Sequence, residues 1–246
     1  MDKFVLGIIP ARGGSKGIPK KNITLVCGIP LIGYTIKAAS QSRLLSDTIV
    51  STDSIEIRDA ALRLGAKVPF MRPPELSDDH SPTIKTVSHA VKMYEELYNK
   101  TVDIIALLQP TTPLRTAADI DQSIKLLLDN PLSNSLISCY LNQRVHPRIM
   151  YTINNGICTP LLNNNTLGIR RQEFEDIYVR NGAVYLTKRQ LLNENKLVDD
   201  YPLCYIMPEE RSVNIDTEYD LKLVEYFFKG SALKNPAKGL VPLNPL

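Results

Sequence analysis

Residues 4–22 read FVLGIIPARGGSKGIPKKN, and the rest of the chain is interpreted outward from this stretch. Its first six residues form an apolar run that is short enough for a buried β-strand. The glycines that follow, at positions 13, 14 and 17, allow a tight turn and a close approach of the backbone to a ligand. No Asp or Glu occurs between positions 3 and 46 to neutralise the cations of this loop, which are Arg12, Lys16, Lys20 and Lys21.

A glycine-rich loop at the carboxyl end of a strand presents backbone amides and basic side chains where a polyphosphate binds. The loop therefore predicts a nucleoside triphosphate site, and the alternative is a basic surface turn. Lys16 precedes Gly17, so the P-loop pattern G-x-x-x-x-G-K-[ST] is missing. Gly13 and Gly14 are adjacent, so the dinucleotide pattern G-x-G-x-x-G is missing too. Both absences disfavour a P-loop hydrolase and a dinucleotide oxidoreductase.

The composition is that of an ordinary globular domain, with 43% hydrophobic and 22% charged residues in a chain of 246. The net charge is only +3, and the local basic cluster is the first loop, which disfavours a dedicated nucleic-acid-binding surface. We see no signal peptide and no apolar run as long as a membrane span, so we expect a cytoplasmic protein that does not bind membranes. The cysteines form no C-x-x-C pair and are expected to be free thiols: Cys27, Cys139, Cys158 and Cys204.

Strand-like and helix-like patterns alternate along the chain, which predicts an α/β fold with a mainly parallel sheet and helices on both faces. Residues 103–108 are the most apolar stretch and are expected to form a central strand. Further strands are expected at 4–9, 48–51, 67–70, 184–186 and 205–206. Helices are expected at 31–40, from 53 to about 64, at 83–98, from 188 onward and at 217–228.

Residues 140–177 interrupt this alternation. Their periodicity is weak, and the turn Asn154-Asn155-Gly156 between two apolar segments predicts a β-hairpin. We interpret the stretch as a small subdomain inserted into one domain of residues 1–230. Residues 231–246 are expected to be a C-terminal tail without regular structure.

Four segments, in order along the chain, resemble a single family. The pattern A-R-x-x-S-K-G-[IL]-P-x-K-N after the first strand resembles the opening motif of the acylneuraminate cytidylyltransferases. This family comprises the CMP-N-acetylneuraminic acid synthetases and related CMP-nonulosonic acid synthetases. The other segments are LLQPTTPLR at 107–115, RQ at 171–172 with NGAVY at 181–185, and VNIDTE at 213–218. The similarity runs from about residue 4 to about residue 228.

The resemblance implies a three-layer, Rossmann-like nucleotidyltransferase fold. The implied reaction is attack by the anomeric 2-hydroxyl of a nonulosonic acid, an acidic nine-carbon sugar, on the α-phosphorus of CTP, with release of pyrophosphate. The family also implies Mg²⁺ as cofactor. It further implies a homodimer in which the inserted subdomain helps to complete the neighbour's active site.

The first loop suits this chemistry, because phosphoryl transfer depends on positioning and charge neutralisation. Arg12, Lys16 and Lys21 are the expected catalytic cations, whereas Lys20 is as well explained as a solvated side chain. By resemblance, backbone atoms near Ala11 read the cytosine edge together with Arg72 and Thr83. Alternatively, Arg72 pairs with Asp78 or Asp79, and Thr83 caps the helix that follows. The full expected nucleotide site is Ala11, Arg12, Gly13, Ser15, Lys16, Lys21, Asn22, Arg72 and Thr83.

The sugar acid is expected past the carboxyl end of the central strand. Gln109, Thr111 and Thr112 offer amide and hydroxyl groups there; the alternative is that residues 111–113 are a simple turn before a helix. By resemblance, Arg171 meets a carboxylate or a phosphate, and Asn181 and Tyr185 belong to the same wall.

Asp216 is the strongest metal candidate, and it counts among the expected catalytic residues. Many relatives read D-x-D where this chain has Asn214-Ile215-Asp216, so one anionic ligand is replaced by an amide. Alternation along a strand would still place residues 214 and 216 on one face. A second departure is Val179, where bacterial sialate enzymes carry an arginine; here the arginine is the next residue, Arg180. Asp53 is a further candidate for positioning metal or substrate, or for capping a helix.

Several alternatives stay open at this level. One alternative acceptor is legionaminic, pseudaminic or another ulosonic acid, and the alternative nucleotide is GTP. Eight-carbon synthetases usually open with A-R-x-x-S-x-R-L-P-G-K, which this chain does not follow. A rival of another class is a non-catalytic nucleotide-sugar binding protein, motivated by Asn214.

Overall fold

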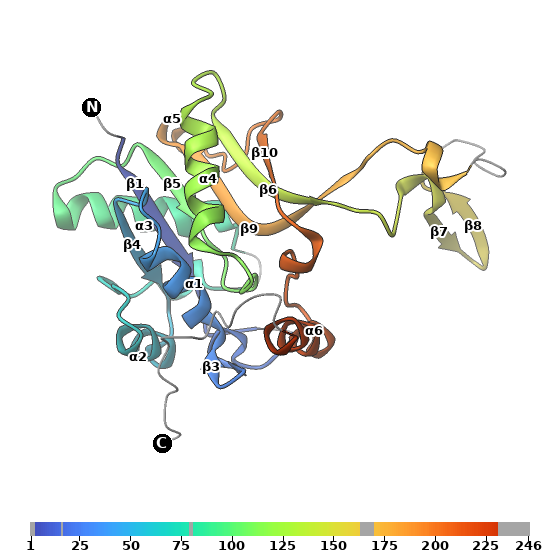
Figure 1. Ribbon diagram of the computed structural model, residues 1–246. Coiled ribbons are helices and arrows are strands. Elements are labelled where there is room, and N and C mark those ends of the chain that lie inside the picture. Colours follow the sequence, from blue (N-terminus) through green and yellow to red (C-terminus); the bar gives the residue numbers. More distant parts are fainter. Residues whose placement is uncertain (1–2, 16, 79–80, 163–169, 231–246) are drawn as a thin grey trace.

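The computed structural model describes residues 3–15, 17–78, 81–162 and 170–230 (Figure 1). The order of strands in its central sheet is β10-β6-β9-β5-β1-β4. In this sheet only β9 runs antiparallel to its neighbours, so the predicted mainly parallel sheet is confirmed. The strands are β1 Val5–Pro10, β4 Asp47–Ser51, β5 Ile104–Leu107, β6 Ser135–Leu141, β9 Tyr178–Lys188 and β10 Leu203–Ile206.

Helices pack on both faces of this sheet, which makes the three layers that were predicted. Alternation along β1 shows how: Val5 and Ile9 join a core with α1, α2 and α4, whereas Leu6 and Ile8 join a core with α3 and α5. The last described helix, α6, lies below the carboxyl ends of the strands in the view of Figure 1. The helices are α1 Leu31–Ser40, α2 Ile55–Arg63, α3 Thr83–Tyr98, α4 Ala117–Leu128, α5 Arg189–Asn193 and α6 Glu218–Lys229.

A third apolar cluster joins the first loop to the C-terminal helix. The small hairpin of β2 Leu25–Val26 and β3 Ile29–Pro30 packs there with α6, and Tyr34 stacks on Phe228 with ring centroids 4.6 Å apart. Ile215 is fully buried in the same cluster. This packing brings Asp216, which is distant in sequence, next to the first loop.

The expected elements are largely confirmed, and α1 and α3 have the predicted bounds. The strand expected at 67–70 is wrong: only single bridges, from Lys67 to Ile49 and from Met71 to Thr52, link this segment to β4. Pro69 has no N–H group to donate to a ladder, which explains the interruption. Helix α4 and strand β6 were not predicted, although Thr116 and Asp119 form a capping box at the start of α4.

The prediction of four free thiols is wrong for one pair. Cys139 of β6 and Cys204 of β10 form a disulfide across 65 residues, with their Cα atoms 6.4 Å apart. The parallel register sets Cys204 beside Ile137 and Cys139 beside Ile206, so the two cysteines are diagonal neighbours. Spacing rules that look for C-x-x-C cannot detect a pairing made by adjacent strands. Cys27 and Cys158 are free, as predicted.

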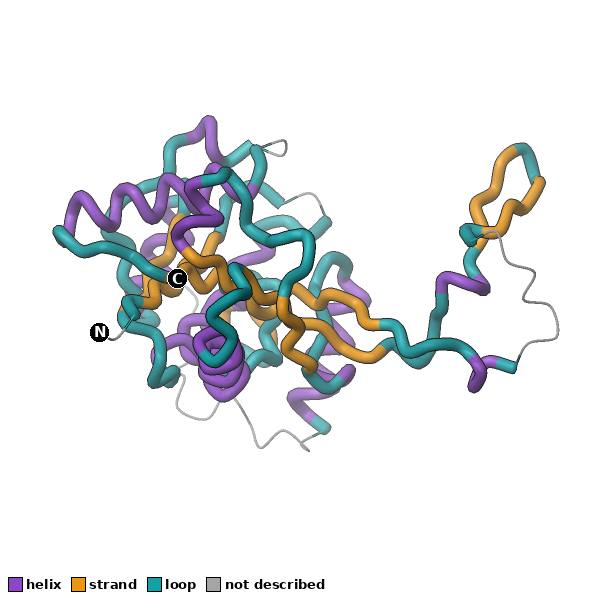
Figure 2. The backbone as a smooth tube through the Cα atoms, turned by 90° about the horizontal axis from the view of Figure 1, so that it is seen from above, coloured by secondary structure: helices purple, strands orange, loops and turns teal. Residues whose placement is uncertain are grey.

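Between β6 and β9 the chain leaves the domain and returns (Figures 1 and 2). We call the described residues between 142 and 177 the arm. It carries a hairpin of β7 Tyr151–Asn154 and β8 Ile157–Pro160, and every residue of these two strands is exposed. Asn155 and Gly156 both have positive φ, as a two-residue hairpin turn requires, so the predicted hairpin is confirmed. The expected C-terminal tail lies outside the described residues.

Among the helices in the described ranges, none has both the length and the apolar character needed to cross a bilayer.

Candidate active site

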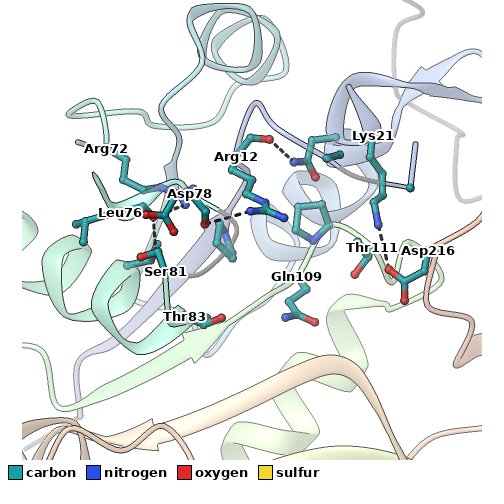
Figure 3. Close-up of a pocket in the computed structure, with 16 residues that line it drawn as sticks. Arg12, Lys21, Arg72, Leu76, Asp78, Ser81, Thr83, Gln109, Thr111 and Asp216 are labelled. Carbon is teal, nitrogen blue, oxygen red and sulfur yellow. Dashed lines mark hydrogen bonds and ion pairs between the residues drawn. The ribbon is translucent and has the colours of Figure 1, made fainter. Parts of the chain in front are cut away.

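A cleft of about 520 Å³ opens at the carboxyl ends of β1 and β5. Successive connections place β4 on one side of β1 and β5 on the other, which makes this point a topological switch, where open α/β sheets bind ligands. The first loop forms one wall of the cleft, and the start of α3 and the residues after β5 form the others (Figure 3). The lining residues are Pro10, Arg12, Ser15, Gly17, Lys21, Asn22, Arg72, Leu76, Asp78, Ser81, Thr83, Thr86, Gln109, Pro110, Thr111 and Asp216.

Hydrogen bonds to Asn22 and Asp53 fix the backbone of the first loop. Asn22 is nearly buried, and its side-chain amide donates to the carbonyl of Arg12 at 3.0 Å. The carboxylate of Asp53 accepts a hydrogen bond from the backbone N–H of Gly13 at 3.0 Å, while Ser54 is the residue that caps α2. Asp53 therefore shapes the loop, and the helix-capping alternative for it is wrong.

Gly17 is needed for space rather than for an unusual φ. A Cβ atom at this position would collide with the backbone carbonyl oxygen of Asp216. The loop thus passes directly against the segment that carries the metal candidate. Ala11 is fully buried, and its N–H donates to the carbonyl of Ser51.

Two of the expected loop cations line the cleft. Arg12 donates to the carbonyl of Asp78 at 3.2 Å, so it reaches across the cleft opening toward α3. Lys21 donates to the carbonyl of Ile215 at 2.9 Å and to the carboxylate of Asp216 at 3.0 Å. Lys20 points elsewhere and pairs with Glu56 on α2, in agreement with its interpretation as a surface side chain. Lys16 lies outside the described residues.

Arg72 and Thr83 both line the end of the cleft that lies away from Lys21 and Asp216 (Figure 3). Arg72 is 5% exposed and donates to the carbonyls of Ser51 at 2.5 Å and Leu76 at 3.5 Å. Its burial lowers the pKa of the guanidinium. Thr83 is the first residue of α3, and Pro82 occupies the capping position, so the capping alternative for Thr83 is wrong.

The residues after β5 divide between the cleft and the core. Gln109 and Thr111 line the cleft. Thr112 is fully buried, and its hydroxyl contacts the carbonyls of Gln109 at 3.2 Å and Gly182 at 3.5 Å. Its position therefore matches the turn alternative better than a contact with substrate.

Residues on β9 form a second layer behind this wall. Asn181 is 3% exposed, and its amide is occupied within the protein: it donates to Ser212 and Met207 and accepts from Ser138. The register of β6 with β9 shifts between the pair Ile137–Tyr185 and the pair Cys139–Arg180. At this shift the Arg180 guanidinium lies 5.8 Å from the ring centroid of Tyr185. Burial raises the pKa of the Tyr185 phenol.

Arg180 lines a neighbouring cavity of about 600 Å³, which meets the cleft at Asp216. Asn181 and Asn214 line this cavity too. Arg171 begins a short 3₁₀ turn, Arg171–Glu173, in the arm. Within one chain, the backbone at Arg171 thus lies apart from the other predicted substrate residues.

The segment carrying Asp216 is extended but pairs with no strand. Ile215 points into the core and its N–H donates to the carbonyl of Thr111 at 2.8 Å, so residues 214 and 216 face outward together. The side-chain amide of Asn214 donates to Asp216 at 2.9 Å. The expected common face is therefore confirmed, although the expected strand is absent from this described segment.

The donor set can be tested against Mg²⁺, which takes one or two carboxylates when phosphate oxygens supply other ligands. The Asp216 side chain is 68% exposed and lies at the border of the cleft. No group of three His, Cys, Asp or Glu side chains that could hold a metal exists among the described residues. The residues therefore fit a nucleotide-bound Mg²⁺ on one carboxylate, and they do not fit a metal held by protein ligands alone.

Two features of the site were missed in the sequence. Asp78 and Ser81 line the cleft between the R-P-x-E-L segment and α3; the acidic pair in front of a predicted helix was the available signal. Arg211 forms a nearly buried ion pair with Asp119 at the start of α4. This pair anchors the chain that leads to Asp216, and no local pattern predicts it.

The family model for cytidylyltransferases matches residues 6–226. The chain belongs to this family. It is a nucleotidyltransferase, as predicted, and its similarity to acylneuraminate cytidylyltransferases is confirmed by named relatives. One is N-acylneuraminate cytidylyltransferase A of Danio rerio, 33% identical over 91% of this chain, which spans only half of that longer protein.

Two bacterial cytidylyltransferases match over nearly their whole length. Pseudaminic acid cytidylyltransferase of Campylobacter jejuni is 30% identical, over 91% of this chain and 96% of its own. CMP-N,N'-diacetyllegionaminic acid synthase of Legionella pneumophila is 32% identical, over 90% of this chain and 94% of its own. A solved structure of CMP:2-keto-3-deoxy-manno-octonic acid synthetase with CTP superposes with a TM-score of 0.69, covering 93% and 99% of the two chains. At 17% identity, that likeness shows the cytidylyltransferase fold.

Proposed function

We propose that this cytidylyltransferase transfers CMP from CTP to the anomeric 2-hydroxyl of a nonulosonic acid of the sialic acid type. The observation that carries the proposal is the cleft itself, where Arg12 and Lys21 face Gln109 and Thr111 across one cavity. Cations on one wall suit a triphosphate, and amide and hydroxyl groups on the other suit a polyhydroxylated acid. The relatives named for neuraminic, pseudaminic and legionaminic acids support the same acceptor class. A reaction that consumes CTP belongs in the cytoplasm.

On the nucleotide side, the protein neutralises charge and fixes geometry. The acceptor hydroxyl gives up its proton to water as its oxygen forms a bond to the α-phosphorus, and the bond from that phosphorus to the pyrophosphate oxygen breaks. Negative charge therefore grows on the leaving group, and Arg12 can span two of its oxygens with a planar fork. Lys21 is held by Ile215 and Asp216, so its charge is already in place before the substrate arrives. Arg72 and Thr83 stand at the far end of the cleft, where the base would lie.

Mg²⁺ would be held by Asp216 together with triphosphate oxygens, and when bound it would neutralise phosphate charge. The other ligand position suggested by D-x-D relatives is occupied here by Asn214, whose amide nitrogen is turned toward Asp216. Asn214 therefore orients the single carboxylate. Its carbonyl oxygen remains a weak, neutral candidate ligand.

On the acceptor side, Gln109 and Thr111 are the proposed contacts in the cleft. The adjoining cavity, lined by Arg180, extends this wall beyond Asp216, and the Arg180 guanidinium lies over the Tyr185 ring. Thr112 and Asn181 support the wall from within, because their polar groups are occupied by internal hydrogen bonds. Because its backbone lies in the arm, we assign Arg171 to the active site of a neighbouring subunit.

We place the arm against a second copy of the chain. The pairing of β7 with β8 puts Tyr151 and Ile153 on one face with Cys158 and Pro160, while Thr152 and Asn154 point to the other face with Ile157 and Thr159. Ile153 is 72% exposed, and an isolated two-stranded hairpin is marginal in water. An apolar face on such a hairpin needs a partner surface, and a homodimer supplies one with twofold symmetry.

Pyrophosphate release in the presence of Mg²⁺ tests the function directly. The purified chain is assayed with CTP or GTP against N-acetylneuraminic, legionaminic and pseudaminic acids and an eight-carbon ulosonic acid. We expect turnover with CTP and a nine-carbon acid. Turnover with the eight-carbon acid alone would contradict the acceptor class, and CTP binding without any turnover would favour a non-catalytic binding protein.

A further inference from the structure

Arg115, the last residue of the 107–115 motif, is a buried cation that the reaction does not contact directly. It is 3% exposed. One terminal nitrogen donates to the carbonyl of Ala183 at 2.6 Å and to the carbonyl of Gln109 at 3.2 Å. That nitrogen also contacts the hydroxyl of Thr112 at 3.2 Å, and the other donates to the hydroxyl of Thr35 at 2.6 Å. All of these acceptors are neutral oxygens.

A buried guanidinium without a partner carboxylate is costly, because its lost hydration is offset only by hydrogen bonds. In the described part of the chain Arg115 forms no ion pair, and the carboxylate of Asp119, four residues further on, is paired with Arg211. Burial lowers the pKa of the Arg115 guanidinium to about 9, so it remains charged at neutral pH. A core that needed only stability would be served as well by an apolar side chain.

The contacts of Arg115 join the two backbone segments around the Gln109 side chain. Gln109 follows β5, and Ala183 lies in β9 next to Gly182. Gly182 has φ of +78°, and a Cβ atom there would lie only 2.7 Å from Oε1 of Gln109. The Gln109 side chain therefore rests directly on the Gly182 backbone, and Arg115 binds the carbonyls on both sides of that contact.

We propose that Arg115 is a positioning residue for the acceptor wall: it ties Gln109 to the Gly182–Ala183 backbone and so sets the direction of the Gln109 amide. This inference rests on the proposed function, in which Gln109 meets the sugar acid. The nucleotide wall, formed by the first loop, makes none of the hydrogen bonds that Arg115 donates. Loss of Arg115 should therefore act on the acceptor and spare CTP.

Arg115→Lys keeps the charge but removes the fork that binds both carbonyls. Its control is Tyr94→Phe. This change removes the 2.7 Å hydrogen bond that the buried Tyr94 donates to Asp47, which lies on the edge strand β4. Both variants are assayed well below their melting temperatures. We expect Arg115→Lys to lower kcat/KM for the sugar acid by about 10- to 100-fold, the scale for a misplaced contact. The Kd for CTP, measured by calorimetry without acceptor, should stay as in the wild type, and Tyr94→Phe should change neither quantity.

A double-mutant cycle with Gln109→Ala tests whether Arg115 acts through Gln109. We expect Arg115→Lys to have little further effect on acceptor kcat/KM in the Gln109→Ala background. Full additivity, or an equal loss of CTP affinity, would overturn the proposal and leave Arg115 as a structural residue.

Amide hydrogen exchange provides a readout that needs no substrate. In Arg115→Lys, exchange should rise in residues 109–112 and 182–184 while residues 17–22 and the amino end of β4 stay unchanged. If the wild-type protein turned over no acid, the proposed function would fail, and this local exchange pattern would still decide the placement. Uniformly faster exchange across the protein, or exchange unchanged from the wild type, would overturn the proposed placement of Arg115.

Discussion

The cleft and the arm are two functional regions built on opposite principles. In the cleft, residues from four distant segments meet in one chain, and hydrogen bonds such as Asn22 to Arg12 hold them there. In the arm, the hairpin exposes every residue of both strands. The difference supports the proposal that one subunit binds the nucleotide, whereas the arm packs against a second chain.

The largest effect on the cleft is expected from Asp216→Ala. This change removes the proposed carboxylate for Mg²⁺ and leaves Lys21 with only the Ile215 carbonyl as a partner. Loss of a metal contact worth several kcal/mol predicts a fall in kcat on the order of 10³-fold. The measurement is pyrophosphate release across a Mg²⁺ titration. Glu218→Gln, which removes an exposed charge two residues away, is the matched control and should keep wild-type turnover.

Arg12→Ala should lower kcat by about 10²- to 10³-fold, the usual result of deleting one donor to developing charge. The melting temperature should hardly change, because Arg12 lines the cleft rather than an apolar core. Lys20→Ala removes a cation from the same loop that pairs with Glu56 outside the cleft, and it should be nearly silent. Equal losses of kcat in both variants under saturating CTP would contradict a specific role for Arg12. They would indicate that the loop acts only through its overall positive charge.

The arm is tested by Ile153→Asp against Thr152→Asp, which places the same charge on the opposite face of β7. Burial of an Ile side chain is worth about 1.5–3 kcal/mol, so Ile153→Asp should weaken the dimer by about 10- to 100-fold. Sedimentation over a concentration series gives the dimer Kd, and turnover at the same concentrations shows whether the arm completes a neighbouring site. A monomeric wild-type protein, or equal effects of both variants, would contradict the proposed interface.

The smallest effect is expected from Asn214→Asp. The new carboxylate would stand within hydrogen-bonding reach of Asp216, so the two like charges repel until a cation binds between them. The Mg²⁺ concentration for half-maximal rate should therefore fall by about a few-fold, while the metal-free protein loses some thermal stability. An unchanged half-point would show that residue 214 does not face the metal.

Prediction from the sequence worked best where the signal was local. The bounds of α1 and α3 followed from apolar periodicity, and the arm hairpin followed from Asn-Gly chemistry. It worked less well for polar residues in motifs: Thr112 and Asn181 were expected to face substrate, and their side chains are nearly or fully buried and occupied within the protein. A motif identifies such a residue as important without saying which side of the wall it supports.

The alternation of strands and helices, the cationic loop and the family could be read from residue order alone, because they depend on residue type and spacing along a few turns of chain. The folded chain was needed to show that Asp216 meets Lys21 across 195 positions, that Cys139 pairs with Cys204, and that Arg115 donates to the carbonyl of Gln109. Those contacts arise from the order of strands in the sheet and from packing between helices. They join residues that are far apart in the chain, and such distances leave no periodic trace in the sequence.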